Sequence, residues 1–522
     1  MAKPTGFHED KRTEALQKEK SEAIINATIP EPQSPAALTV QAARCMDCGV
    51  SFCHAAFVVD GQSIGCPLSN LIPEINDLVY RGEIEKAYLR MSKTHPFPEF
   101  TARVCPALCE GSCTLGEHGS AVTIKEIERY VIDEMMQSGK IAPRMPRVST
   151  GKRVAVVGSG PAGLACADLL NQLGNAVTVF ERADRPGGLL MYGIPNMKLD
   201  KNLILGRVRI MSDEGVRFEL GAGVGTDYPV LSVMKDFDAI VLCGGATAER
   251  TLDVPGAALL GVMTALNFLT QSTANILDGA IIDGLPSIDG KNVVVVGGGD
   301  TGTDCIASAI RRGAASVTQL EIMPEPPAER GAGNPWPLWP KIKRTGYGQH
   351  EAIERFGADP REYCTTVKEI IGDGQKVTGI KTVQVEWRTE QGSGNHRPDN
   401  VPESAKAGSV QAPAKIGDAQ ESAKAGGVPV PVEIPGTERE RPCDIVFTAM
   451  GFTGPERLLI DQLSLETDTR GRVAVRKPGS FRTNTPTVFT AGDMRRGPSL
   501  VVWAIDEGRR AARCCHAYLS ER

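Results

Sequence analysis

The first residues able to do chemistry in this 522-residue chain are cysteines. Cys45, Cys48 and Cys53 form a C-x2-C-x4-C group, and Cys66 follows thirteen residues after Cys53, directly before Pro67. Thiolates at such spacings suit zinc or an iron–sulfur cluster. A Cys-Pro pair ends ferredoxin-type groups, and its thiol commonly binds the other cluster of a pair. We therefore expect Cys66 to serve a different metal centre from Cys45.

A second cysteine group, "CPALCEGSC", places Cys105, Cys109 and Cys113 four residues apart. Both groups together contain seven of the fourteen cysteines. We interpret the seven scattered cysteines as small core residues: Cys166, Cys243, Cys305, Cys364, Cys443, Cys514 and Cys515.

A glycine-rich loop gives the next chemical signal. Gly158, Gly160 and Gly163 form a G-x-G-x-x-G between a β-branched strand and an amphipathic helix. Such glycines let the backbone approach a pyrophosphate at the helix N-terminus. Glu181 closes the next strand twenty-three residues after Gly158, where a carboxylate can hold a ribose diol. The alternative is a tight turn without a ligand. The other residues expected in this dinucleotide site are Pro161, Ala162, Arg182, Gly188 and Leu189.

The same pattern recurs later in the chain. Gly297, Gly299 and Gly302 repeat the loop, and Glu321 takes the place of Glu181. Two such loops predict two dinucleotides, one bound as a prosthetic group and one that exchanges. The remaining residues expected in the second site are Asp300, Thr301, Arg311 and Arg312. The two arginines end the helix that follows the loop, where they could reach a phosphate or simply favour the helix C-terminus as solvated cations.

The elements that position these residues belong to several domains, because 522 residues are too many for one core. The stretch "IPEINDLVYRGEIEKAYLRM" has helical periodicity and lies in a cysteine-bearing helical domain. Two α/β units then follow, each closed by an apolar strand, "DAIVLCGGA" and "DIVFTAMGF". We expect a helical domain over 1–147, a first dinucleotide domain over 148–285 and 484–522, and a second over 286–483. A segment with two "ESAKAG" copies, 389–437, is expected to be a flexible insertion.

Bulk composition excludes several classes of protein. Hydrophobic residues make up 41% and charged residues 23% of the chain, which is ordinary for a globular protein. The net charge of −5 gives no reason to expect nucleic acid or an anionic membrane as a partner. The first twenty residues lack the apolar core of a signal peptide, and no apolar run approaches the roughly 18 residues needed to cross a bilayer. A cytoplasmic location is therefore expected.

The C-terminal stretch "TPTVFTAGDMRRGPSLVVWAIDEGRRAA" adds a specific resemblance. Together with the two glycine loops it is similar to the two-dinucleotide flavoprotein reductases. That resemblance implies that the first loop binds the ADP half of FAD and the second binds NADPH or NADH. It also implies that Asp493, beside Gly492, binds the ribityl chain. The FAD-side units contain no C-x(2–4)-C pair, so a disulfide reductase is disfavoured and the electrons need another exit.

From the cysteine block to "AGD", the chain resembles the small (β) subunit family of glutamate synthase, most specifically in "CPALCEGSCTLGEHGSAVTIKEIERYVID" and "NPWPLWP". The same architecture occurs at the N-terminal end of dihydropyrimidine dehydrogenase. The resemblance implies two [4Fe-4S] clusters with crossed ligands. The first would use Cys45, Cys48, Cys53 and Cys113; the second would use Cys66, Cys105, Cys109 and a non-cysteine ligand. Alignment favours Glu128 for that ligand, with Glu126 as the fallback and an ordinary helix carboxylate as the alternative.

The resemblance implies a fold with a helical iron–sulfur domain and two Rossmann-like domains. It implies an NAD(P)H-dependent oxidoreductase in which cofactors rather than side chains do the chemistry, so no catalytic residue is predicted. Electrons would pass from nicotinamide through FAD and the clusters to a large (α) subunit that forms glutamate. The alternatives are zinc in place of iron, a related ferredoxin-type or pyrimidine-reducing oxidoreductase, and a flavin-bearing redox scaffold or sensor.

Overall fold

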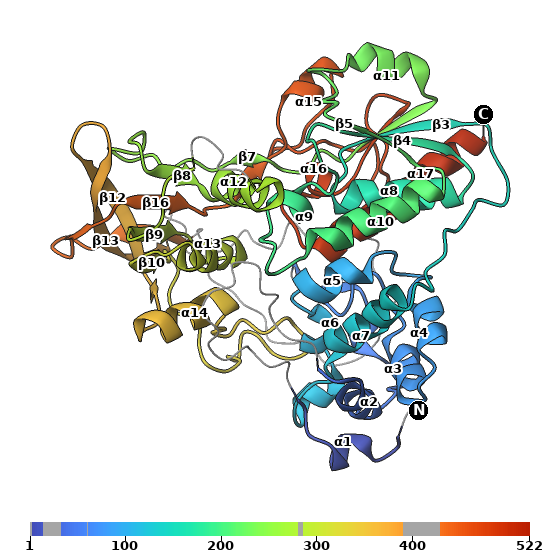
Figure 1. Cartoon of the computed structure of the whole chain (residues 1–522), viewed down its shortest axis with the longest axis horizontal. Coiled ribbons are helices and arrows are strands. Elements are labelled where there is room, and N and C mark those ends of the chain that lie inside the picture. Colours follow the sequence, from blue (N-terminus) through green and yellow to red (C-terminus); the bar gives the residue numbers. More distant parts are fainter. Residues whose placement is uncertain (1–2, 14–32, 60, 280–284, 390–428, 522) are drawn as a thin grey trace, which may run out of the picture.

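The computed structural model describes residues 3–13, 33–59, 61–279, 285–389 and 429–521. Figure 1 shows a helical part that contains the N-terminus, an α/β part that contains the C-terminus, and a second α/β part beside them. The expected architecture of a helical domain followed by two parallel α/β sheets is confirmed. None of the helices in the described ranges combines the length and the hydropathy of a membrane span.

The helical part holds all seven clustered cysteines. Its helices are α1 (Gly6–Glu9), α2 (Pro35–Ala43), η1 (Phe52–His54), α3 (Ile72–Tyr80), α4 (Ile84–Met91), α5 (Pro98–Val104), α6 (Leu108–Gly111), η2 (Thr114–Glu117) and α7 (Ile124–Gln137). One antiparallel hairpin, β1 (Phe57–Val59) and β2 (Gln62–Ile64), projects from it. The helical stretch expected from periodicity forms two helices, α3 and α4, because the chain turns at Gly82 with φ +72°.

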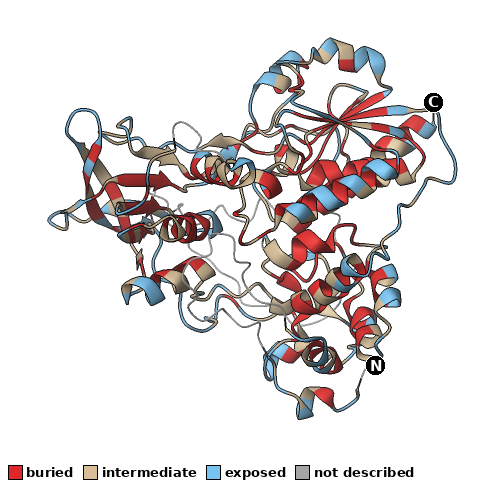
Figure 2. Ribbon diagram, viewed as in Figure 1, coloured by how far each residue is buried: buried red, intermediate tan, exposed pale blue. Residues whose placement is uncertain are grey.

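The first parallel sheet has the order β18-β6-β3-β4-β5. Its strands are β3 (Arg153–Val157), β4 (Ala176–Glu181), β5 (Arg217–Leu220), β6 (Ala239–Leu242) and β18 (Val488–Thr490). Its helices are α8 (Pro161–Gln172), α9 (Leu189–Tyr192), α10 (Lys201–Asp213), α11 (Val230–Asp236), α15 (Leu458–Gln462), α16 (Asp493–Arg496) and α17 (Val501–Ser520). Strands β3 and β6 are almost wholly buried apolar runs, as expected for a parallel sheet with helices on both faces (Figure 2).

The second parallel sheet has the order β11-β10-β9-β16-β8. Its strands are β8 (Val262–Thr264), β9 (Asn292–Val296), β10 (Ser316–Leu320), β11 (Arg361–Glu362) and β16 (Ile445–Thr448). Its helices are α12 (Ala265–Asp278), α13 (Asp300–Arg311) and α14 (Tyr347–Phe356). An antiparallel sheet of β12 (Thr365–Gly372), β13 (Val377–Thr389), β14 (Pro429–Glu433) and β15 (Arg439–Pro442) packs beside it.

Strand pairing divides the chain differently from the boundaries expected from sequence. Strand β8 and helix α12 fall within 148–285, yet β8 pairs with the second sheet and α12 packs in its core. Ile460 and Val473 fall within 286–483, yet they pack in the core of the first sheet. The two crossings between the α/β parts run side by side as the antiparallel pair β7 (Ala248–Glu249) and β17 (Phe452–Gly454). The division therefore lies at this strand pair.

The expected insertion, 389–437, also differs at one end. Residues 390–428 lie outside the described part of the chain. Strand β14 pairs with β13 from Val385 to Thr389. Main-chain hydrogen bonding therefore fixes the backbone of residues 429–433, which composition alone assigned to a flexible segment.

A buried ion pair joins the helical part to the first α/β part. Glu99 on α5 and Arg207 on α10 are both almost fully buried. The Arg207 Nε donates to Glu99 Oε1 at 2.6 Å, and its Nη2 donates to Oε2 at 3.2 Å. Because both side chains are shielded from water, each charge offsets the free-energy cost of burying the other.

Replacing Glu99→Ala should lower the free energy of unfolding by about 3–5 kcal/mol, because it leaves a buried guanidinium without a counter-charge. The measurement is the urea midpoint of the full chain, with unfolding of its helices followed by circular dichroism. Asp461→Ala is the control, because its pair with Arg457 is 3.0 Å long but exposed and should contribute nothing measurable. Equal midpoints for the two variants would contradict this account of the interface.

Candidate functional site

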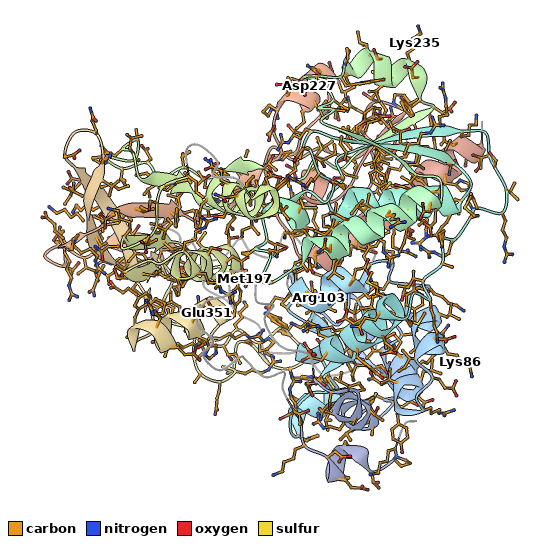
Figure 3. All side chains as sticks on the ribbon, in the orientation of Figure 1. Lys86, Arg103, Met197, Asp227, Lys235 and Glu351 are labelled. Carbon is orange, nitrogen blue, oxygen red and sulfur yellow. The ribbon has the colours of Figure 1, made fainter. Side chains whose placement is uncertain are left out.

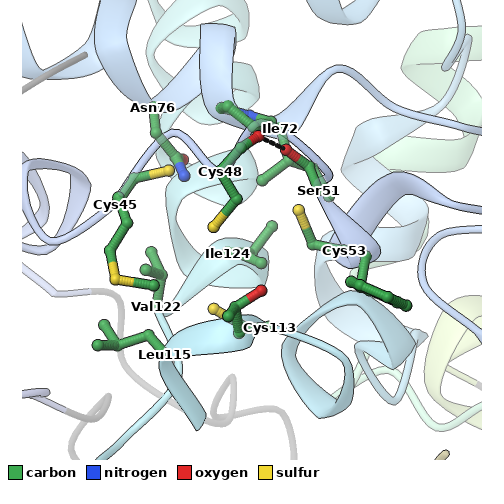
Figure 4. A pocket seen from close by; sticks show the side chains of 14 residues that line it. Cys45, Cys48, Ser51, Cys53, Ile72, Asn76, Cys113, Leu115, Val122 and Ile124 are labelled. Carbon is green, nitrogen blue, oxygen red and sulfur yellow. Dashed lines mark hydrogen bonds between the residues drawn. The ribbon is translucent and has the colours of Figure 1, made fainter. Parts of the chain in front are cut away.

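One cavity in the helical part is lined by four cysteines, Cys45, Cys48, Cys53 and Cys113. Cys45 follows α2, Cys53 lies in η1 and Cys113 follows α6, so three separate elements contribute. Figure 4 shows the sulfur atoms of Cys48, Cys53 and Cys113 turned toward the middle, with Cys45 at the edge beside Asn76. The remaining wall is largely apolar and includes Ile72, Leu115, Val122 and Ile124.

A second cavity is lined by Cys66, Cys105, Cys109 and Glu128. The Glu128 carboxylate is buried, and its Oε1 accepts a hydrogen bond from Asn70 Nδ2 at 2.6 Å. Burial raises the pKa of Glu128 to about 7, and the Asn70 hydrogen bond opposes that shift. Glu126 lies two residues earlier on α7, 4.0 Å from Arg129, and so faces another direction. The structure therefore brings Glu128, rather than Glu126, to the three thiols.

The two cavities are separated by a short main-chain contact. The Cys66 N–H donates to the Cys53 carbonyl at 2.7 Å, so the thirteen-residue step between them closes on itself. The intervening residues form the β1–β2 hairpin, which leaves and returns at the same point. Gly65, with φ +72°, completes the return, because a Cβ there would lie 2.2 Å from the Phe52 carbonyl oxygen. Cys53 and Cys66 are therefore adjacent in space, although their thiols line different cavities.

The electrostatics of both cavities fit a group that carries positive charge. Burial raises the pKa of the Cys45, Cys53 and Cys113 thiols. It raises the pKa of Cys66 to about 12 and that of Cys105 to about 11. Thiolates are the metal-binding form, and a bound cation offsets the cost of burying them. Burial thus disfavours the ionised form of these thiols, and a bound metal would offset that effect.

The first glycine loop is built for close backbone approach. Gly158 has φ +99°, and a Cβ there would lie 2.5 Å from the Cys243 carbonyl oxygen. A Cβ on Gly163 would lie 1.9 Å from the Gly158 carbonyl oxygen, whereas the space around Gly160 is open. The Glu181 carboxylate accepts hydrogen bonds from the main-chain N–H groups of Ser159 (3.0 Å) and Ala183 (2.9 Å). This leaves room for a phosphate over Gly160 and places the carboxylate beside the loop.

The C-terminal turn meets the same loop. Gly492 has φ +69°, and a Cβ there would lie 2.7 Å from Ala162 Cβ in the first turn of α8. Asp493 therefore lies at the mouth of the first loop, where its Oδ1 accepts a hydrogen bond from Ser499 Oγ at 2.6 Å. Burial raises the pKa of Asp493 to about 6.

Other expected residues of this site divide into two groups. Gly188 packs on Gly160, since a Cβ on Gly188 would lie 3.0 Å from the Gly160 Cα. Pro161 is the first residue of α8, and Leu189 begins α9 next to Gly188. Arg182 instead extends outward and pairs with Glu456 at 2.9 Å. The structure thus gathers the glycines, Pro161, Ala162, Leu189 and Asp493 but turns the Arg182 side chain away.

The second glycine loop repeats this geometry. Gly297 has φ +125°, and a Cβ there would lie 2.3 Å from the Ala449 carbonyl oxygen. A Cβ on Gly302 would lie 2.5 Å from the Gly297 carbonyl oxygen, and the space around Gly299 is open. The Glu321 carboxylate lies against the loop, because a Cβ on Gly298 would overlap its Oε2. Asp300 and Thr301 are exposed in the first turn of α13.

The two arginines expected near this loop lie elsewhere. Arg311 donates to both carboxylate oxygens of Glu351 on α14, at 3.1 and 2.6 Å; Figure 3 labels Glu351. Arg312 donates to the Ser272 carbonyl at 3.3 Å. Both are at the C-terminal end of α13, about 17 Å along the helix from the glycine loop. The structure does not bring them to Glu321.

Several residues around these sites were missed by sequence reasoning. Asn70 bridges Glu128 and Thr94, and its one local signal is its place four residues after Cys66. Lys198 donates to Asp304 at 3.1 Å, and Tyr347 donates to the same carboxylate at 2.6 Å. This network joins the two α/β parts. No spacing in the sequence indicates it, because its members come from three distant segments.

Comparison with known protein families gives two matches. Residues 24–140 match the dihydropyrimidine dehydrogenase domain II family, which is described as a 4Fe-4S cluster domain. Residues 152–333 and 416–508 match the pyridine nucleotide-disulphide oxidoreductase family. The helical part is therefore a 4Fe-4S cluster domain by family, and the two α/β parts form the flavin- and NAD(P)-binding portion.

Curated relatives cover nearly the whole chain. The glutamate synthase [NADPH] small chain of Bacillus subtilis is 43% identical over 99% of both chains. The Mycobacterium tuberculosis small chain is 43% identical over 92% of this chain and 88% of its own. Glutamate synthase [NADH] of Saccharomyces cerevisiae is 42% identical over 92% of this chain, which spans only 21% of that protein.

Among solved structures, FprA of Mycobacterium tuberculosis in complex with NADPH superposes with a TM-score of 0.50. The match covers 71% of this chain and 85% of FprA, at 18% identity. At that identity the likeness concerns the fold alone.

Exchanging Cys66→Ser should damage the metal centre of the second cavity and leave that of the first largely intact, because Cys66 lines only the cavity of Cys105 and Cys109. Electron paramagnetic resonance of the reduced variant is the measurement, with Cys48→Ser as the converse. Loss of the same signal in both variants would show that the two cavities do not hold separate centres.

Proposed function

The chain belongs to the glutamate synthase small-chain family and is an NAD(P)H-oxidising flavoprotein oxidoreductase, and we propose that its electrons leave through two [4Fe-4S] clusters to a glutamate synthase large chain. The observation that carries this proposal is the division of seven thiols and one carboxylate between two cavities. Each cavity then has four side chains for the four irons of one cluster. Glu128 is the eighth ligand in this assignment.

The nucleotide assignment follows from the loops. We assign FAD to the loop of Gly158 because Asp493, the residue expected to hold the ribityl chain, meets it through Gly492. The loop of Gly297 and Glu321 is then the site of the exchanging nicotinamide nucleotide. When bound, FAD accepts two electrons as a hydride from the nicotinamide and releases them one at a time. Relatives named for NADPH and for NADH both match this chain.

The order of the two clusters follows from what surrounds each cavity. The second cavity is lined in part by Val502 at the start of α17, nine residues beyond Asp493. Cys66 and Cys109 are buried there, and Cys105 is partly exposed. The four cysteines of the first cavity are all partly exposed. Since electrons tunnel efficiently only over short distances, the second cavity receives them from the flavin and the first passes them to the partner.

Exposed apolar side chains close in sequence to the first-cavity cysteines favour the docking of a protein partner. Val50 is 74% exposed, and the β1 residues Phe57, Val58 and Val59 are 58%, 49% and 43% exposed. We name these four side chains the apolar hairpin patch. Exposed apolar side chains gathered in one segment mark an interaction site. Val50 lies between Cys48 and Cys53, which line the first cavity, so we assign the patch to the electron-accepting large chain.

Other facts support this partner and its compartment. The Saccharomyces cerevisiae relative is about five times longer than the region it shares with this chain, so there the remaining glutamate synthase chain is covalently attached. The fourteen cysteines form no disulfide among the described residues, which suits a reducing compartment such as the cytoplasm.

The isolated holoprotein should oxidise NADPH or NADH with ferricyanide or a tetrazolium dye, because both nucleotide loops and both cavities belong to this chain. It should form no glutamate from glutamine and 2-oxoglutarate until a large chain is added. Anaerobic assays with and without purified large chain measure both activities. Absence of dye reduction in a protein loaded with flavin and iron would contradict the electron-input role.

Substituting Phe57→Ser and Val58→Lys together should weaken binding of the large chain about 10- to 100-fold, because it places polar groups and a charge at a desolvated contact. Ferricyanide reduction should stay unchanged. The matched control is Leu231→Lys on α11, an equally apolar residue that is 75% exposed on the far part of the molecule (Figure 1). Sedimentation velocity measures association. If both variants bind the large chain as tightly as the wild type, the patch is not the interface.

A further inference from the structure

A segment of the second α/β part reaches across to the helical part. We name residues 330–346, between β10 and α14, the strap. Arg330 donates to the Gly111 carbonyl at 3.0 Å, and the Ser112 hydroxyl donates to the Pro337 carbonyl at 2.9 Å. A Cβ on Gly111 would lie 2.8 Å from the Trp339 ring. The strap is thus packed on the C-terminal end of α6 and on Ser112, between Cys109 and Cys113, whose thiols line different cavities.

The other end of the strap returns to the second glycine loop. A Cβ on Gly346 would lie 3.0 Å from the Thr303 side chain, and one on Gly348 would lie 2.3 Å from the Thr303 carbonyl oxygen. Tyr347 donates to Asp304 at 2.6 Å. Thr303 and Asp304 belong to the first turns of α13, which begins at Asp300. The end of the strap therefore runs beside the helix N-terminus where a pyrophosphate would bind.

Arg344 lies on this part of the strap. Its guanidinium lies over the Trp339 ring at 3.9 Å, and the ring covers part of a residue that is otherwise exposed. No ion pair joins it to a carboxylate among the residues that the structure describes. Burial lowers the pKa of Arg344, with a contribution from Arg330, while the negative charges of Glu110 and Asp300 oppose the shift. A cation without a counter-ion is thus held within electrostatic reach of the first residue of α13.

We propose that Arg344 binds the pyrophosphate of the nicotinamide nucleotide in the second glycine loop. This inference rests on the proposed function, because it assigns that loop to the nicotinamide nucleotide. A pyrophosphate would supply the negative charge that Arg344 does not receive from a carboxylate. A guanidinium group can bind it through two parallel N–H groups. The open space around Gly299 leaves room for the phosphates between the loop and the strap.

The stacking gives Arg344 its position. The Trp339 ring fixes one face of the guanidinium, and Gly111 of the helical part supports the same ring. A preorganised arginine loses less side-chain freedom when the ligand binds. Through Trp339 the helical part therefore helps to position a residue of the nicotinamide nucleotide site.

The test compares binding of NADP⁺ and NAD⁺ to the oxidised holoprotein by isothermal titration calorimetry. Arg344→Ala should weaken both nucleotides by the same factor, about 10- to 100-fold, because both carry the pyrophosphate. Arg344→Lys keeps the charge but not the stacked fork, and should lose less affinity. Trp339→Leu keeps the arginine without its support, and should fall between wild type and Arg344→Ala.

Lys343→Ala is the matched control. It removes the neighbouring positive charge, but Lys343 pairs with Glu325 and Asp359. Its nucleotide affinities should stay within about two-fold of wild type. Unchanged affinity in Arg344→Ala, with wild type binding normally, would overturn the inference alone. So would a loss confined to NADP⁺, which would assign Arg344 to the 2′-phosphate. A wild-type holoprotein that binds neither nucleotide would overturn both the inference and the proposed function.

Discussion

The hydrogen bond from the Cys66 N–H to the Cys53 carbonyl determines how the metal-binding part is organised. It joins the main chain of Cys53, whose thiol lines the first cavity, to the main chain of Cys66, whose thiol lines the second. The antiparallel pairing of β1 with β2 and this hydrogen bond together bring Cys66 back beside Cys53. The β1–β2 hairpin between Cys53 and Cys66 contains no cysteine, so its apolar side chains are available to contact a partner. One main-chain contact thus accounts for two cavities and for an exposed hairpin between them.

Electron transfer over short distances requires the three parts of the molecule to keep fixed positions. Three contacts provide this. Glu99 and Arg207 join the helical part to the first α/β part through a buried ion pair. Lys198 joins the two α/β parts through Asp304. The strap joins the second α/β part to the helical part, because Trp339 packs against Gly111. The Glu99–Arg207 and Lys198–Asp304 pairs bury charged groups. If either pair separated, a buried charge would be left without its counter-charge, so these contacts allow little movement between the parts.

Much of the fold could be predicted from local pattern. Each glycine loop lies between a strand and a helix, and its chemistry depends on residues close in sequence, so both Rossmann-like units are confirmed. The cysteine groups indicated two metal centres, and the structure places their thiols around two cavities; their roles as ligands stay a prediction. Domain boundaries were harder, because β8 joins a sheet whose other strands lie later in the chain.

The arginines show a different limit. Arg311 and Arg312 follow the second loop closely in sequence, yet a twelve-residue helix separates them from it in space. Arg344, which is farther away in sequence, is brought back to the helix by the packing of Gly346 on Thr303. Glu99, Trp339 and Asp304 act through partners from distant segments. Periodicity and spacing describe neighbours along the chain, so they cannot indicate such contacts.

Two separate clusters, one of them with a single carboxylate ligand, are proposed to lie between the flavin and the partner. Mössbauer spectroscopy of holoprotein enriched in ⁵⁷Fe is the decisive measurement, because each iron reports its own ligands. We expect about eight irons per chain in two [4Fe-4S] clusters of equal area, with one iron site altered by an oxygen ligand. In Glu128→Cys that site should become like the others. Iron confined to a single cluster, or zinc in its place, would rule out the two-cluster arrangement.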